Sequence, residues 1–179
     1  MVFDIVSYLL EVAAGLFGGA CLLRLYMQWQ RVPFGNPIGR FVFAITDWLV
    51  LPLRKVLPAI GRIDTASLVA AYLIECVQWL LILAMRGSIE IDWLLGMALF
   101  GLVRLAISAM IALLLVYAIL SWIQNDSPMA DVIDRLCAPL LRPIRKVVPL
   151  AGGFDLSPLI LLVLLQVALM VLTAAVRGF

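Results

Sequence analysis

The chain has 179 residues, of which 65% are hydrophobic and 13% are charged, and its formal net charge is +2. Soluble domains are about 45–50% apolar, so this composition excludes a soluble monomer. Histidine is absent, which removes the commonest general base and the commonest metal ligand. The cysteines form no CxxC motif, so neither a zinc site nor a redox pair is expected. We therefore predict no catalytic residue, metal or cofactor, and the small net charge predicts no nucleic-acid partner.

Apolar segments long enough to cross a bilayer recur along the chain. The first one follows Asp4 rather than a basic region and has no small-residue cleavage site, so we expect a retained helix and not a signal peptide. The predicted fold class is an all-α membrane protein with four transmembrane helices. These spans are expected at residues 5–29, 66–86, 93–123 and 158–177.

Two long connections, one inside each half of the chain, resemble each other. Residues 52–68 align with residues 143–159, and eight of the seventeen positions are identical. This similarity predicts an internal duplication, with a first repeat at 1–91 and a second at 92–179 in one integrated membrane domain. Each repeat holds two spans, so the chain returns to its starting side and the two repeats are parallel.

Basic residues predict the orientation of the chain. The turn at residues 87–92 has no basic residue and contains Glu90 and Asp92. The positive-inside rule therefore places both connections in the cytoplasm, across the membrane from the two termini. The basic residues of the connections are Arg31, Arg40, Arg54, Lys55 and Arg62 in the first, and Arg135, Arg142, Arg145 and Lys146 in the second.

The connections are expected to form amphipathic helices. In the second one, apolar and basic side chains fall on opposite arcs of a helical wheel, which favours a helix lying flat in the headgroup region. Pro139 and Pro143 are expected to kink this helix or split it in two, because an interior proline removes a backbone donor. A re-entrant path for residues 40–60 and 130–150 is the alternative, since irregular backbone is tolerated where protein or water surrounds it.

The repeated PxRKVxP-x2-G-x2-D pattern and the duplicated four-span layout resemble the YggT family of bacterial membrane proteins, called YlmG in Gram-positive bacteria and plastids. The resemblance covers essentially the whole chain. It implies a location in the bacterial inner membrane and roles in osmotic or ion homeostasis, in the assembly of membrane complexes, or in division or nucleoid organisation. The first copy departs from the second at two places. Trp48 stands where the second copy has Pro139, and Ala66-Ser67 stands where the second copy has Ser157-Pro158. The matching residues are Arg54, Pro58, Gly61, Asp64, Arg145, Pro149, Gly152, Asp155, Ser157 and Pro158.

Within this motif, the acidic residues are expected to cap the spans that follow them, because a carboxylate accepts hydrogen bonds from first-turn amides. Asp64 and Asp155 each follow an arginine by ten residues, so an ion pair within each copy is also predicted. Arg54-Lys55 and Arg145-Lys146 have two interpretations. They bind anionic headgroups or a membrane-protein partner, or they only set the topology.

Four charges lie inside the spans, where an ionisable group is normally paired or faces a cavity. The offset of 93 between Glu11 and Arg104 places them at a similar depth, so we predict one ion pair between them and a second between Arg24 and Glu75. These pairs either lock the helices together, with Arg24 reaching the interface, or belong to a polar path. In that path Glu75 and its repeat-equivalent Gln166 would serve an ion or proton.

Gly15 and Gly19 form a small-xxx-small pattern that lets transmembrane helices approach closely, either within the chain or in a homo-oligomer. The function that fits best is a non-catalytic organiser or assembly factor that contacts lipid headgroups or proteins through its basic segments. The alternative is a small oligomeric ion channel or transporter involved in osmotic or ion homeostasis. An enzyme is not expected, because no nucleophile lies beside a plausible base.

Overall fold

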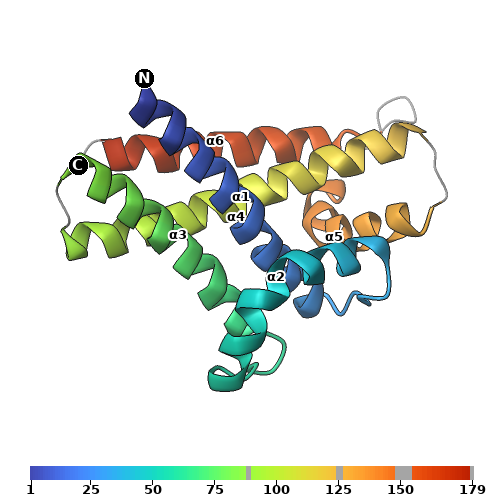
Figure 1. Ribbon diagram of the computed structural model, residues 1–179. Helices are drawn as coiled ribbons and strands as arrows, with labels where there is room; N and C mark the ends of the chain where they lie inside the picture. Colours follow the sequence, from blue (N-terminus) through green and yellow to red (C-terminus); the bar gives the residue numbers. More distant parts are fainter. Residues whose placement is uncertain (88–89, 124–126, 148–154, 178–179) are drawn as a thin grey trace. The chain divides into compact units, whose positions relative to one another are not determined.

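The computed structural model describes residues 1–87, 90–123, 127–147 and 155–177, and these residues form an all-helical protein (Figure 1). Four of its helices are long and apolar enough to span a membrane, which confirms the predicted spans and fits a multi-pass membrane protein. The shorter α2 and α5 occupy the two long connections. The helices are α1 (Val2–Trp29), α2 (Pro37–Val56), α3 (Thr65–Arg86), α4 (Ile91–Ile123), α5 (Pro128–Arg145) and α6 (Ser157–Arg177).

Two compact units divide the chain, Met1–Ala106 and Ile107–Phe179, and their boundary lies inside α4. The first unit contains α1, α2, α3 and the beginning of α4, and the second contains the rest of α4 with α5 and α6. The repeat boundary expected between residues 91 and 92 concerns the sequence and stays a prediction.

Small side chains hold the first unit together, as is typical of helices packed in a membrane. A Cβ atom at Gly18 would lie 2.7 Å from Leu105 Cδ2, whereas one at Gly15 or Gly19 would meet nothing within 4 Å. The prediction that Gly15 and Gly19 pack spans within the chain is therefore wrong, and a homo-oligomer contact there stays a prediction. The buried small residues of these helices are Ala14, Gly18, Ala20 and Cys21 of α1 with Ala66, Ser67, Ala70 and Ala71 of α3.

Helix α2 begins with clear local signals. The Asn36 side chain accepts a hydrogen bond of 2.9 Å from the Gly39 amide, and Pro37 occupies the first turn, where its missing N–H is not needed. A side chain at position 39 would overlap the backbone of Phe34, so glycine is required there. The helix contacts both α1 and α3. It does so through a stripe at helical spacing, Gly39, Val42, Thr46 and Val50.

Helix α5 is capped in the same way, with the Ser127 hydroxyl accepting a hydrogen bond of 3.2 Å from the Ala130 amide. Pro139 and Pro143 both lie inside this one helix, so the two-piece alternative is wrong, and the kink stays a prediction. Each proline removes only one backbone hydrogen bond, and a continuous buried apolar face holds the helix in place. That face consists of Val132, Ile133, Leu136, Cys137 and Leu141.

Candidate functional site

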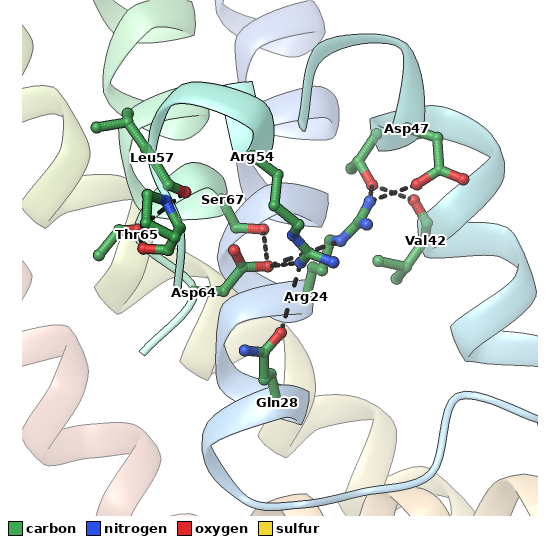
Figure 2. Close-up of polar contacts among 11 residues, drawn as sticks. Arg24, Gln28, Val42, Asp47, Arg54, Leu57, Asp64, Thr65 and Ser67 are labelled. Atoms are coloured by element: carbon green, nitrogen blue, oxygen red, sulfur yellow. Dashed lines mark hydrogen bonds and ion pairs between the residues drawn. The ribbon is translucent and has the colours of Figure 1, made fainter. Parts of the chain in front are cut away.

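A buried arginine joins the first two helices of the first unit (Figure 2). Arg24 of α1 is only 2% exposed, and its Nη1 donates hydrogen bonds of 2.8 Å to Thr46 Oγ1 and 2.7 Å to Asp47 Oδ1 of α2. The guanidinium also lies over the Phe43 ring, 4.6 Å from its centroid. Charge-assisted hydrogen bonds are roughly twice as strong as neutral ones, so Arg24 fixes α2 against the transmembrane α1.

The fully buried Asp64 extends this cluster to the beginning of α3. Its Oδ2 accepts hydrogen bonds from Arg54 and from the Ser67 hydroxyl, the latter at 2.7 Å, and lies 3.9 Å from Arg24 Nε. The predicted Arg54–Asp64 ion pair is confirmed. The predicted cap is wrong, because this carboxylate accepts no backbone hydrogen bond at the N-cap position. The Asp64 carboxylate instead accepts its hydrogen bonds from the Arg54 and Ser67 side chains.

The second unit closes its own ion pair at the corresponding place. Arg145, at the end of α5, donates from Nε to Asp155 Oδ2 at 2.8 Å and from Nη2 to the Tyr117 hydroxyl of α4 at 2.8 Å. Asp155 Oδ1 accepts a hydrogen bond of 2.9 Å from the Ser157 amide, so both the predicted pair and the predicted cap are confirmed. Partial burial would raise the pKa of Asp155, but hydrogen bonds from Ser157 and Arg145 outweigh it and hold that pKa below its ordinary value.

The other residues of the repeated motif shape the turns beside these pairs. The Pro58 carbonyl accepts a hydrogen bond of 2.8 Å from the Thr65 hydroxyl. Gly61 has a φ of +62°, in the left-handed region that favours glycine, within the turn that pairs Ile60 with Ile63. Pro158 is buried in the first turn of α6. Pro149 and Gly152 lie outside the described residues.

The lysines next to the paired arginines have a different environment. Lys55 and Lys146 are exposed, whereas Arg54 and Arg145 are engaged by the acids described above. The four basic residues expected to act together therefore fall into two groups with different roles. The arginines hold the connection to the next span, and the lysines are accessible to a ligand.

Mid-span charges form one of the two predicted pairs. Arg104 Nη2 lies 2.7 Å from Glu11 Oε1, which confirms that pair. Arg24 does not pair with Glu75, because Asp47 and Asp64 already bind its guanidinium. Asp64, at the N-cap of α3, precedes Glu75 by eleven residues, about 16 Å along the helix axis at 1.5 Å per residue. Arg24 is also buried rather than extended to the interface.

A groove in the second unit contains the remaining residue of the predicted polar path, Gln166. Its volume is about 490 Å³, and its polar side chains are neutral. No group of three or more potential metal ligands occurs in the part of the chain that the structure describes. The groove is lined by Ser108, Ile111, Gln166, Leu169, Met170 and Thr173.

Comparison with known proteins relates this arrangement to a family. The family model described as CCB3/YggT matches residues 3–85 and 96–176. The chain belongs to the CCB3/YggT family. It is 39% identical over 162 residues to the uncharacterized protein YggT of Escherichia coli K12, covering 90% of this chain and 85% of that protein. An uncharacterized protein of Vibrio alginolyticus, from the proC 3′ region, is 34% identical over 166 residues, covering 90% of each. No solved structure matches the chain.

Sequence reasoning missed several members of the two clusters. Thr46 and Asp47 lie in α2, where the sequence prediction rested on basic and apolar residues, and Tyr117 is an uncharged residue of a span in which the prediction rested on Arg104. One signal was present, because Asp47 is an acid among the basic and apolar residues of α2. Ser67 carried no such signal, since one hydroxyl at a helix start is common. In this family member the clusters attach a connecting helix to spans, and their ionic groups are already paired.

Proposed function

We propose that this member of the CCB3/YggT family is a non-catalytic protein of the bacterial inner membrane that organises membrane complexes or assists their assembly. The observation that supports it most directly is the pair of arginine–aspartate contacts, Arg54–Asp64 and Arg145–Asp155. Each contact holds the end of a connecting helix at the start of the next span. Each leaves the neighbouring lysine, Lys55 or Lys146, exposed.

The proposal includes a parallel duplication of the chain. Its support is the family model's match to two segments of similar length, 3–85 and 96–176, together with the repeated motif. Under this arrangement α2 and α5 lie flat at the cytoplasmic surface, where anionic headgroups attract basic side chains by roughly 1 kcal/mol each. The same face then presents charges to a membrane-protein partner. We propose Lys55 and Lys146 as the residues that make this contact.

Site-specific cross-linking in intact membranes tests the proposal. A photoreactive amino acid at position 55 or 146 should form the same cross-linked products with membrane proteins. The same probe at Glu90, in the acidic turn expected on the opposite side, is the matched control and should not form these products. Lys55→Glu with Lys146→Glu should abolish them when a probe is placed at the exposed position Arg62. Reversal of charge removes attraction to an acidic surface without disturbing the Arg54 and Arg145 ion pairs.

The contrary outcome is equally specific. Products that are unchanged by the double lysine reversal, or that form as readily from position 90, would overturn the assignment of this face. Alanine variants of Arg54 and Arg145 also remove the ion pairs that hold α2 and α5. They therefore serve as controls that show how loss of this structure, rather than loss of surface charge, affects the products.

A small oligomeric ion channel or transporter is the second candidate function. The observation that favours it is the buried Glu75, which lies in electrostatic range of Glu11 and Arg104 in the middle of the spans. Intramembrane ionisable groups frequently mark ion pathways. Ion flux through liposomes containing the purified protein, compared between the wild type and Glu75→Gln, tests this function. Flux abolished by Glu75→Gln would support a polar path through the spans, and absence of flux in folded, inserted wild type would remove this candidate.

A further inference from the structure

A buried carboxyl group in the middle of α3 lacks a role in the clusters described above. Glu75 is 3% exposed and directed at α4, where a Cβ atom at Gly101 would overlap its carboxylate. The same Cβ would lie 3.2 Å from the indole nitrogen of Trp79. That nitrogen is buried and has no hydrogen-bond partner among the described residues. Gly101 therefore leaves room for two polar groups that converge on one point between α3 and α4.

The charges around this point do not balance. Glu75 lies in electrostatic range of Arg104 on α4 and Glu11 on α1, and those two bind each other at 2.7 Å. Its titratable neighbours on α3 are Cys76 and Tyr72. If every acid and base were ionised, two carboxylates would share one guanidinium. A buried carboxylate without its own counter-ion is strongly disfavoured, and such groups bind a proton instead.

We propose that Glu75 is a reversible proton-binding site and that Arg104 exchanges between Glu11 and Glu75 as the proton is lost and gained. Protonated Glu75 is neutral and leaves Arg104 to Glu11, which is the arrangement of the structure. Release of the proton leaves a carboxylate on α3 that competes with Glu11 of α1 for the same guanidinium. The proton thereby changes which helix Arg104 of α4 binds.

A proton fits this point better than a metal cation. Sodium, calcium and similar cations need several oxygen ligands. The group that converges here with the Glu75 carboxylate is an indole N–H, which donates a hydrogen bond and ligates no cation, and the guanidinium in electrostatic range ligates none either. This inference does not depend on the organising role proposed above, and proton binding is measured without any assay of flux.

Chemical modification of the whole protein in detergent or liposomes tests the inference directly. Dicyclohexylcarbodiimide reacts with protonated carboxyl groups in apolar surroundings, and mass spectrometry of peptides identifies the residue modified. The reaction is followed from about pH 5 to about pH 9, a range in which buried glutamates titrate. We expect modification at Glu75, decreasing about tenfold for each pH unit above the midpoint, as for a single carboxyl. The paired Glu11 should remain unmodified.

Two variants distinguish exchange of Arg104 from a passive structural role. Glu11→Gln frees Arg104 to bind the Glu75 carboxylate, so modification should be confined to more acidic pH. Arg104→Gln removes that cation, so modification should persist to more alkaline pH. The exposed Arg40→Gln removes the same charge elsewhere in the first unit and should leave the profile unchanged. Shifts in opposite directions are not expected if these residues only hold helices together.

The wild type alone is sufficient to overturn the inference. Folding is checked by protection of the buried Cys21 from thiol reagents. No modification of Glu75 in folded protein at any pH, or modification that does not change with pH, would refute proton binding. Protection of Glu75 by sodium chloride but not by choline chloride, at constant pH, would overturn the proton assignment in favour of a metal cation.

Discussion

Replacing Arg24 with methionine tests whether the buried cluster holds the first unit together. Methionine keeps the length and apolar stem of the side chain but removes both hydrogen bonds to α2 and the contact with Phe43. Removing one partner of a buried ion pair costs about 3–5 kcal/mol. The lower end applies here, because Asp47 is 40% exposed and regains hydration, while Asp64 retains Arg54.

Thermal unfolding in detergent, followed with a thiol-reactive dye, measures this loss. In a background of Cys76→Ala and Cys137→Ala, only Cys21 reports, and it lies in the core shared by α1, α2 and α3. A loss of about 3 kcal/mol lowers the melting temperature by roughly 10–20 °C for a unit of this size. Arg40→Met is the matched control, since it removes an exposed arginine from the same helix α2.

A graded result is expected along the cluster. Asp47→Asn should lower the melting temperature less than Arg24→Met does, since the Asp47 carboxylate is partly exposed and its ion pair is partly screened. If Arg24→Met melts within about 2 °C of Arg40→Met, which corresponds to under about 0.5 kcal/mol, the cluster contributes little. The argument that charged groups fix α2 would then be refuted, and apolar contacts would have to account for its position.

Two further predictions concern the other ion pairs. Because the pKa of Asp155 is held below its ordinary value of 3.8, the stability it contributes is present above that pH and is lost as the pH falls through the folded value. Reaction of the buried Cys137 with a dithiodipyridine reagent should therefore accelerate below about pH 3.8 in the wild type, and Asp155→Asn should lose this acid dependence. For the mid-span pair, Glu11→Arg and Arg104→Glu should each lower the melting temperature, and the double variant should regain most of that loss. A double variant as unstable as the two single variants would show that the pair contributes nothing.

The most predictable features of the chain were those that a period or an offset in the sequence specifies. Continuous apolar runs gave the four spans, because a bilayer imposes a minimum length. The ten-residue spacing between Arg54 and Asp64 recurs between Arg145 and Asp155, and both pairs form in the structure. An offset that places two opposite charges at one depth was enough to pair Glu11 with Arg104.

The errors came from features that depend on helix rotation and on competing partners. Gly15 and Gly19 fit the small-residue pattern, but Gly18, on an adjacent face of α1, makes the close approach to Leu105. Sequence alone gives no absolute rotation for a helix that is apolar on all sides. Arg24 was paired with the acid left over after Glu11 was assigned. The acids that bind it lie in or after a connecting helix whose position could not be inferred.

The two connecting helices differ in how firmly they are held, although both end in an arginine–aspartate pair. In the first unit Asp64 is fully buried and Arg24 adds a second cation, so separating α2 from the spans would leave charges unpaired. In the second unit Asp155 is 30% exposed and the added partner is the neutral Tyr117. Water stabilises these charges when the pair opens, and exposed pairs contribute only about 0–1 kcal/mol. The arginine–aspartate pair at the end of α5 therefore opens at a lower cost than the corresponding pair at the end of α2.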